Sequence, residues 1–261
     1  MDTADLIARI VRQRQQRYFE SIPGIERLGQ VPCRPDGPRL HIAFASALPG
    51  AAPALVDAVL AYCQRQGLSA DWTVIPARAG EAELEAPLRA RGLRVEEHQR
   101  LLAREGPITG TPSPRVAVVP IDTLDAMMVY EAGSRASFFY DQAPLREAVE
   151  RRARQRFDEQ ARGWCRYLAA YLDNRPVGGC YYTRWEEVPT IIGVYTVAQA
   201  RRNGVATALV THVIRTLWSG GNHSCCLFVR DGNPAERIYQ GLGFVPLLEE
   251  YTYSRDAPLP F

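Results

Sequence analysis

The feature that most constrains the fold is a β-prone run joined to a long amphipathic helix by a glycine turn. Residues 188–197, VPTIIGVYTV, are apolar on both faces of a strand, which is typical of a central strand covered by other elements on both sides. After RRNG (residues 201–204), apolar residues recur at helical spacing from Val205 to Leu217, and two glycines end the pattern. This order predicts an α/β protein.

The remaining patterns divide the chain in two. Residues 105–114, EGPITGTPSP, gather glycine, proline and hydroxyl residues, and hydrophobic periodicity stops there. We therefore expect one domain at 1–108, a linker at 109–114 and a second domain at 115–261. In the second domain the patterns indicate a strand, two helices, a hairpin, the central strand, the long helix, a strand, a short helix and a last strand.

Composition narrows the class of protein. The net charge of +2 provides no overall field to attract nucleic acid or an anionic membrane, and we expect neither as a partner. No run of about 18 apolar residues is present, and the acidic first residues are not typical of a secretory signal, so we expect a cytoplasmic location. Six cysteines without CxxC spacing predict reduced, buried thiols, and no metal-binding pattern occurs.

The turn before the long helix indicates an anion site. The order strand, RRNGVA, helix puts the backbone amides of residues 202–206 at the positive end of a helix dipole. Gly204 and Ala206 lack bulk, so a phosphate or pyrophosphate can approach the backbone, and Arg201 and Arg202 add charge at the rim. The segment is neither a dinucleotide fingerprint nor a phosphate loop with its lysine.

Three motifs in this order resemble the GCN5-related N-acetyltransferase (GNAT) superfamily. They are TVAQARRNGVATAL, CCLFV and NPAERIYQGLGF, and the resemblance extends from about Arg115 to Arg255. It implies an α/β (α+β) fold with a mixed, mostly antiparallel sheet flanked by helices. It also implies an N-acetyltransferase that uses acetyl-CoA and moves the acetyl group to a primary amine of a small molecule or peptide, by direct attack in a ternary complex.

The resemblance also assigns roles to residues of this chain. Tyr239 would donate a proton to the departing thiolate, which is sensible because a phenol has a pKa of about 10. Asn233 departs from the family, lying six residues before the tyrosine where the family has seven, so a ligand role and a helix-cap role both stay open. The residues implied to hold the cofactor are Tyr195, Thr196, Val197, Arg201, Arg202, Asn203, Gly204, Val205, Ala206, Thr207 and Asn233.

The proton acceptor and the acyl acceptor are less well determined. Thr190 stands where some family members carry a glutamate base, and we assign no base. We expect Glu186 and Glu187 to be solvated at a hairpin tip, while Glu131 and Asp141 lie where the family binds its acceptor. The aromatic run at 138–140 either lines the acceptor site or fills the core. Together with the near-neutral charge, it argues against a polynucleotide or strongly acidic acceptor.

The first domain resembles a degenerate second copy of the same fold. LRARGLRVEE aligns with YQGLGFVPLLEE, which pairs Gly92 with Gly243 and puts Leu88 in the place of Tyr239. Its glycine turn, SALPGAAPA, has no arginine, and Pro49 and Pro53 each remove an amide donor. This predicts a tandem acetyltransferase whose first half binds no cofactor.

Two alternatives stay open at this point. One is a non-catalytic acyl-CoA sensor or scaffold, which the lack of a clear base keeps in consideration. The other is a nucleotide-binding protein that uses the same helix terminus, although it would lack a phosphate-loop lysine and a carboxylate pair for magnesium. Whether the chain forms a homodimer also stays open.

Overall fold

The computed structural model describes residues 3–20, 26–28, 31–36, 38–78, 80–109, 115–138, 146–184 and 186–255. The chain forms two compact units. Unit 1 comprises Met1–Leu101, Val229–Asn233 and Pro246–Phe261, and unit 2 comprises Leu102–Phe228 and Pro234–Val245. These units differ from the domains that we expect from the sequence, because two pieces of the range 115–261 belong to unit 1. Most of the expected linker, 110–114, lies outside the described residues.

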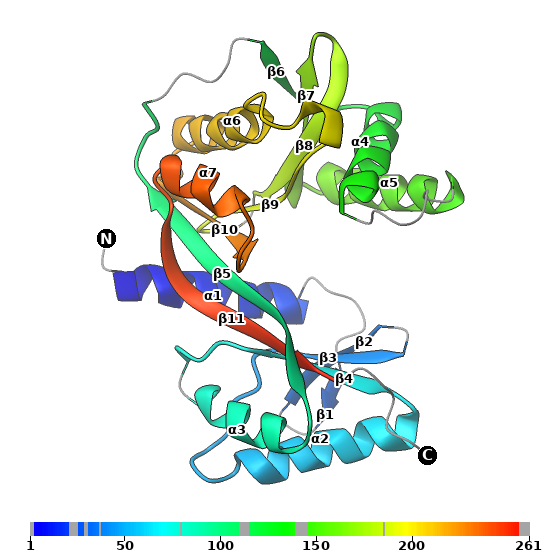
Figure 1. The fold of residues 1–261 in the computed structure, drawn as a ribbon, viewed down its shortest axis with the longest axis vertical. Helices are drawn as coiled ribbons and strands as arrows, with labels where there is room; N and C mark the ends of the chain where they lie inside the picture. Colours follow the sequence, from blue (N-terminus) through cyan, green and yellow to red (C-terminus); the bar gives the residue numbers. More distant parts are fainter. Residues whose placement is uncertain are drawn as a thin grey trace. The chain divides into compact units, whose positions relative to one another are not determined.

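Unit 1 is built on a mixed sheet with helices packed against it (Figure 1). Its strand order is β1-β2-β3-β4-β11-β5; β3 and β4 are parallel, whereas β1/β2, β2/β3 and β4/β11 are antiparallel. The elements are α1 (Thr3–Glu20), β1 (Glu26–Leu28), β2 (Val31–Asp36), β3 (Arg39–Ile42), α2 (Ala52–Gln66), β4 (Ser69–Val74), α3 (Ala82–Ala90), β5 (Arg94–Glu105) and β11 (Val245–Ser254).

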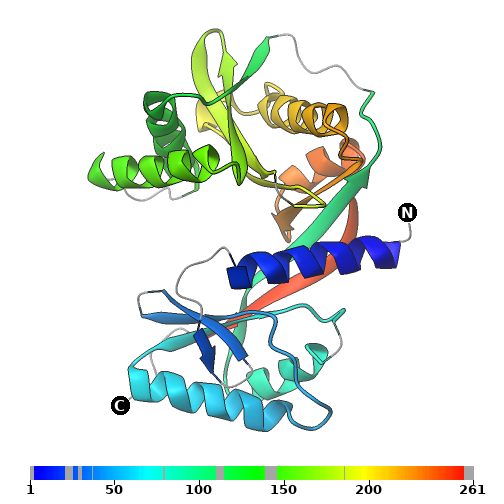
Figure 2. The same ribbon diagram turned by 180° about the vertical axis from the view of Figure 1, so that it is seen from behind.

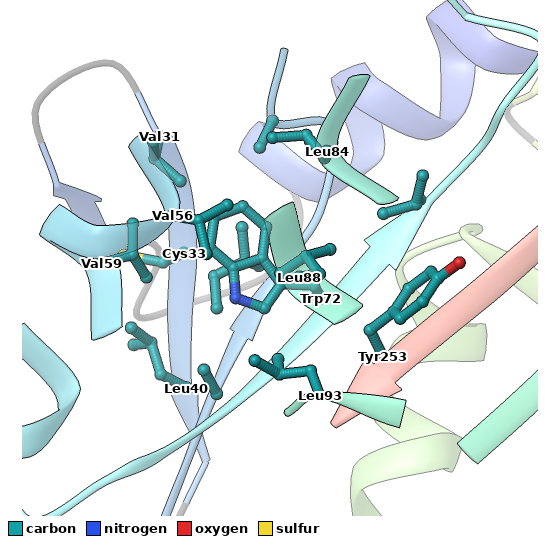
Figure 3. Close-up of a cluster of buried hydrophobic side chains, with 14 of the residues drawn as sticks. Val31, Cys33, Leu40, Val56, Val59, Trp72, Leu84, Leu88, Leu93 and Tyr253 are labelled. Atoms are coloured by element: carbon teal, nitrogen blue, oxygen red, sulfur yellow. The ribbon is translucent and has the colours of Figure 1, made fainter. Parts of the chain in front are cut away.

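The core of unit 1 surrounds Trp72 of β4 (Figure 3). Its fully buried indole lies among apolar side chains of α2 and α3, such as Val56 and Leu88. Tyr253 of β11 belongs to the same cluster, and its hydroxyl donates to Glu85 Oε2 at 2.6 Å. The last strand of the expected second domain therefore pairs with β4, Tyr253 opposite Trp72, and completes the sheet of unit 1.

Unit 2 has a sheet with the strand order β5-β10-β9-β8-β7-β6. The helices α4 and α5 cover one face, and α6 covers the other (Figures 1 and 2). β9 and β10 are parallel, and the pairs β6/β7, β7/β8 and β8/β9 are antiparallel. The elements are β6 (Val116–Pro120), α4 (Leu124–Phe138), α5 (Arg146–Ala161), β7 (Cys165–Leu172), β8 (Arg175–Thr183), β9 (Thr190–Thr196), η1 (Ala198–Ala200), α6 (Val205–Ser219), β10 (Ser224–Arg230) and α7 (Ala235–Gly241).

These elements confirm the α/β fold with mixed, mostly antiparallel pairing. The predicted hairpin turns at Asp173 and Asn174, both with positive φ, as a two-residue turn of a twisted hairpin requires. The six cysteines are buried and free, as we expect from their spacing. Within the described ranges, the chain has no helix with the length and apolar character needed to cross a membrane.

Two stretches of the chain repeat one order of elements. The series β3-α2-β4-α3-β5 matches β9-α6-β10-α7-β11, and in each series the first two strands pair in parallel. The ends of α3 and α7 also match. The amide of Leu93 donates to the Leu88 carbonyl at 3.1 Å, and that of Phe244 donates to the Tyr239 carbonyl at 3.0 Å. These are the residue pairs that the sequence alignment predicts.

Glu81 is a fully buried carboxyl group in unit 1, at the start of α3. Its Oε2 accepts a hydrogen bond from the amide of Ile75 at 2.7 Å, and the guanidinium of Arg78 contacts Oε1. Burial raises the pKa of Glu81 to about 7, although the Ile75 amide and Arg78 both act in the opposite direction. Glu81 therefore titrates close to neutral pH.

This burial predicts a pH-dependent stability. The folded protein holds the Glu81 proton more tightly than the unfolded chain, whose reference pKa is 4.5. Relative to Glu81→Gln, the wild type should therefore lose stability as the pH rises from 4.5 through about 7, by about 3 kcal/mol in total. Denaturant unfolding of both proteins at about pH 5 and pH 8 measures this, and an unchanged difference between them would contradict it.

Candidate functional site

A β-bulge in β9 determines the shape of the sheet at the centre of unit 2. Gly179 of β8 pairs with Tyr195, but Tyr181 pairs with Ile192, so two residues of β9 lie opposite Cys180. The first of these two, Gly193, has φ +63°, a left-handed conformation that glycine adopts without strain. Such a bulge bends a strand, and β9 changes direction halfway along its length.

Beyond the bulge, β9 has an unpaired backbone edge. Its parallel pairing with β10 comprises Thr190–Cys226 and Ile191–Leu227 and then ends. Residues Ile192 to Thr196 continue along β8 without a register partner in β10. Their amide and carbonyl groups on that edge are available to a ligand with amide groups of its own.

Gly178 permits a close approach between β8, β9 and the start of α6. A Cβ atom at Gly178 would lie 2.5 Å from the Tyr195 carbonyl oxygen and 2.9 Å from Val205 Cγ1. Both distances are too short for non-bonded carbon contacts, and the first neighbour is backbone. The absence of a side chain at Gly178 therefore fixes the spacing between the edge of β9 and the first turn of α6.

The turn before α6 presents six successive backbone amides. Arg202 and Gly204 have φ +66° and +77°, so left-handed residues alternate with others, as in anion-binding nests. Gly204 is the N-cap of α6, and no side chain caps the helix. Within the described residues, the amides of 202–207 donate no hydrogen bond, and the first helical bond runs from Ala208 to Gly204 at 2.9 Å.

The side chains around these amides suit an anion. Arg201, Arg202 and Asn203 are exposed, and the first turn of α6 contains no acidic residue. Asn203 donates from its side-chain amide to the carbonyls of Ala200 and Arg201, each at 3.2 Å, which holds the turn. Val205 is buried, whereas Ala206 and Thr207 are partly exposed at the helix terminus. The structure thus brings the predicted residues 201–207 together around one set of amides.

Tyr195, Thr196 and Val197 lie at the end of β9, on the unpaired edge and just beyond it. The Tyr195 side chain is buried and its hydroxyl donates to the Tyr130 carbonyl at 3.1 Å, which attaches β9 to α4. Burial raises the pKa of this phenol well above its usual range. The Tyr195 side chain is therefore structural, and its backbone continues β9 beyond the last register pair with β10.

Tyr239 is buried in α7, with 6% of its surface exposed. Its ring packs edge-on against Phe244 at 6.2 Å between centroids. Burial raises the pKa of Tyr239 to about 12, and Cys180 of β8 raises it further, as it also does for Tyr195. Tyr239 therefore keeps its proton at neutral pH.

Asn233 lies before α7 and is exposed. The assigned helix begins at Ala235, and Pro234 before it already has helical angles, φ −61° and ψ −17°, as expected of a proline at a first helical position. Asn233 also belongs to the segment Val229–Asn233 of unit 1, whereas α7 belongs to unit 2. The cap role and the ligand role of Asn233 therefore both stay open.

The carboxylates considered as bases differ from their expected environments. Glu186 is buried rather than solvated, and its Oε2 accepts hydrogen bonds from the hydroxyls of Thr183 and Thr190. It closes the connection between β8 and β9 through two threonines that lie only three and four residues away in the sequence. Glu187 is exposed as expected, and Asp141 lies outside the described residues.

The aromatic segment after α4 is described only at its first residue. Phe138 is 49% exposed and touches Tyr195 edge-on, with 6.4 Å between ring centroids. It therefore does not fill the core. Phe139 and Tyr140 lie outside the described residues.

A comparison with protein families agrees with this geometry. Residues 130–244 match the model of the acetyltransferase (GNAT) family, and this range contains the bulge, the turn, α6 and Tyr239. The match covers 115 of the 261 residues, and this segment is similar to the acetyltransferase (GNAT) family. No curated protein sequence matches the chain.

Solved structures resemble this chain over most of its length. A GCN5-related N-acetyltransferase from Kribbella flavida shares 16% identity, with 96% of this chain and 95% of that chain covered and a TM-score of 0.71. One from Sphaerobacter thermophilus has 16% identity, 95% and 86% coverage and a TM-score of 0.70. A tandem GNAT protein from the clavulanic acid biosynthesis pathway has 15% identity, 92% and 85% coverage and a TM-score of 0.65. At these identities the likeness shows the fold.

The contact at Gly178 predicts a strong effect of one methyl group on unit 2. Gly178→Ala should lower the free energy of unfolding by about 1–3 kcal/mol, because backbone of β9 must move to admit the Cβ atom. Gly241→Ala is the matched control, since a Cβ atom there meets nothing within 4 Å. Equal stability of the two variants in denaturant unfolding would show that β8 and β9 do not depend on this contact.

Proposed function

We propose that the chain transfers an acetyl group from acetyl-CoA to a primary amine of a small molecule or peptide, by direct attack in a ternary complex. The observation that supports this most directly is the set of six unbonded amides at 202–207, at the start of a helix in a segment similar to the GNAT family. The six free, buried thiols fit a reducing compartment, and we propose the cytoplasm.

The amides at 202–207 fit a pyrophosphate. Their N–H groups point from a helix N-terminus, where the dipole favours negative charge, and a chain of them can serve two phosphate groups. In this proposal Gly204, Val205, Ala206 and Thr207 donate through their backbone. Arg201 and Arg202 add charge-assisted hydrogen bonds from the rim, and Asn203 holds the turn.

The unpaired edge of β9 fits the pantetheine arm of the same molecule. That arm carries amide groups, and Tyr195, Thr196 and Val197 offer backbone donors and acceptors beyond the last β10 register pair. One of these amides can also polarise a carbonyl oxygen, which stabilises charge that develops there during acyl transfer. Acetyl-CoA supplies the acetyl group as a thioester, which an amine attacks without a covalent enzyme adduct.

Tyr239 is the proposed proton donor to the sulfur. Its pKa of about 12 keeps the phenol protonated but makes it a weaker acid than a free phenol, so its first contribution is a hydrogen bond to the sulfur on which thiolate charge develops. A hydrogen bond from the phenol lowers the energy of that charge before the proton moves. Because Tyr239 stays protonated, its titration should not change kcat between about pH 6 and pH 9.

For unit 1 we propose the role of a degenerate copy that binds no acetyl-CoA. The repeated element order and the matching ends of α3 and α7 support this. At the position that matches Tyr239, Leu88 is fully buried and has no proton to give. Its helix α2 starts after Gly50 (φ +77°), but Pro53 in the first turn of that helix removes an amide donor.

The geometry of the turn predicts that a negatively charged side chain at position 206 disrupts acetyl-CoA binding, whereas a neutral side chain of the same size does not. Ala206→Glu should raise the Kd for acetyl-CoA by about 30-fold or more, because a carboxylate among the amides repels a pyrophosphate. The same carboxylate should leave folding intact, since an acidic residue in a first helical turn is favourable. Isothermal titration with acetyl-CoA measures the affinity.

Ala206→Gln is the matched control, with the same bulk and no charge. It should keep most of the affinity. Equal binding by the wild type and Ala206→Glu would show that the pyrophosphate lies elsewhere, and no binding to the wild type would defeat the proposed function.

Tyr239→Phe should lower kcat by about 100-fold while acetyl-CoA affinity stays the same. The packing against Phe244 survives this substitution, so stability should change little. Steady-state turnover over a panel of amines, together with titration of acetyl-CoA, separates the two effects. An unchanged kcat would mean that the tyrosine only packs, and binding without turnover of any amine would favour a sensor that binds acyl-CoA.

A further inference from the structure

Between α4 and α5 of unit 2 lies a cavity of about 420 Å³ whose walls are rich in arginine. We call it the arginine cavity. α4 contributes Glu131 and Arg135, and α5 contributes Arg151, Arg152 and Arg156. One carboxylate therefore faces four guanidinium groups, although the whole chain carries a net charge of only +2.

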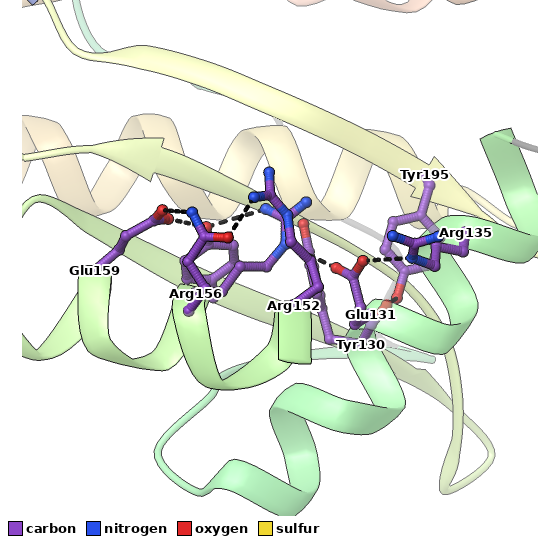
Figure 4. Close-up of polar contacts among 9 residues, drawn as sticks. Tyr130, Glu131, Arg135, Arg152, Arg156, Glu159 and Tyr195 are labelled. Atoms are coloured by element: carbon purple, nitrogen blue, oxygen red, sulfur yellow. Dashed lines mark hydrogen bonds and ion pairs between the residues drawn. The ribbon is translucent and has the colours of Figure 1, made fainter. Parts of the chain in front are cut away.

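Glu131 does not neutralise this cavity. Its carboxylate is 2% exposed, and it accepts hydrogen bonds from Arg135 Nε at 2.9 Å and from Arg156 Nε at 2.7 Å (Figure 4). Two guanidinium groups thus share one carboxylate. The remaining charge at this end of the cavity is positive.

Arg151 and Arg152 have no acidic partner among the described residues. Arg151 is exposed and forms no ion pair there, and Arg152 donates to the neutral amide oxygen of Gln155 at 2.7 Å. Other arginines of α5 do find carboxylates, such as Arg146 with Glu150. Guanidinium groups that line a cavity without a carboxylate are suited to an anionic ligand, which they can hold with two parallel hydrogen bonds each.

The floor of the cavity is rigid. Arg156 donates to the Tyr167 hydroxyl at 3.1 Å and lies over the rings of Tyr130, Tyr167 and Tyr181, at 5.9, 5.5 and 5.6 Å from their centroids. These contacts hold its guanidinium in one orientation. A fixed arginine loses little conformational entropy when a ligand binds.

The cavity is also linked to the edge of β9. Tyr130, next to Glu131 in α4, accepts the hydrogen bond of Tyr195 through its carbonyl. Tyr195 belongs to the segment along which the proposed acetyl-CoA would lie. Figure 4 shows Tyr195, Tyr130 and Glu131 in this succession. An acceptor molecule held in the cavity would therefore lie on the side of the sheet that carries α4, close to the end of β9.

From these contacts we infer that the arginine cavity binds a carboxylate or phosphate group, and that this group belongs to the amine that receives the acetyl. The assignment of this group to the acetyl acceptor rests on the proposed function. The inference reverses the expectation from composition, which argued against a strongly acidic acceptor, because the charge at this cavity is not the average charge of the chain.

A binding experiment tests the cavity without any turnover. Phosphate and glutarate are titrated into the full chain that carries Ala206→Glu, so that the amides of α6 do not contribute. Adding Arg151→Gln and Arg152→Gln should weaken binding of at least one of the two anions by about tenfold or more. Arg154→Gln is the matched control, since Arg154 is exposed on the same helix and does not line the cavity.

The outcomes of this titration are distinct. Weakening by the double substitution alone supports the inference. If Arg154→Gln weakened anion binding equally, the effect would be one of general charge and would not support the inference. If neither anion showed saturable binding, the inference would be overturned.

A second experiment identifies the source of the anionic group. Acetylation is compared within pairs of amines that differ in one anionic group, such as glucosamine 6-phosphate with glucosamine and aspartate with asparagine. The anionic member of at least one pair should have a kcat/KM about tenfold higher, and Arg151→Gln with Arg152→Gln should remove that preference.

The two proposals can fail separately. Acetylation without any preference for anionic amines would refute the acceptor inference and leave the proposed function standing. Anion binding without acetyl-CoA binding would keep the arginine cavity as an anion site, and would refute the acetyl transfer and with it the acceptor role.

Discussion

The bend of β9 at Gly193 is the constraint on which the rest of unit 2 depends. Because two residues lie opposite Cys180, the strand turns away from β10 after Ile191. That divergence frees the backbone edge from Ile192 to Thr196 and directs the chain into the turn before α6. Gly178 then fixes how closely the edge and the helix approach. A side chain at either glycine would disturb the edge and the amides together, so one local geometry underlies the whole proposed acetyl-CoA site.

The arginine cavity shows why net charge is a poor guide to a site. Nearly equal numbers of acidic and basic residues, 29 and 31, leave the chain at +2. At the cavity, helical spacing brings Arg152 and Arg156 to one side of α5, while α4 supplies a single carboxylate. The net charge of the chain does not reveal this local excess of arginine, since it records how many charges there are and not where they lie.

Local patterns in the sequence predicted most elements of the fold and the turn of the candidate site. The helices, the hairpin at Asp173 and the amides near Gly204 each depend on residues close together in the chain. What could not be predicted depends on contacts between distant residues. Tyr253 pairs with Trp72, and its hydroxyl donates to Glu85, 168 residues earlier in the chain. A strand's hydrophobic pattern says that it will pair, but not with which strand.

The position of β11 has a consequence for how the protein is made. Unit 1 contains the first residues to be synthesised, yet its sheet needs a strand that follows almost the whole of unit 2. Until that strand emerges from the ribosome, β4 has an open edge and the core around Trp72 lacks Tyr253. The unit that starts first is therefore completed last, and a nascent chain must keep it from pairing with other strands in the meantime.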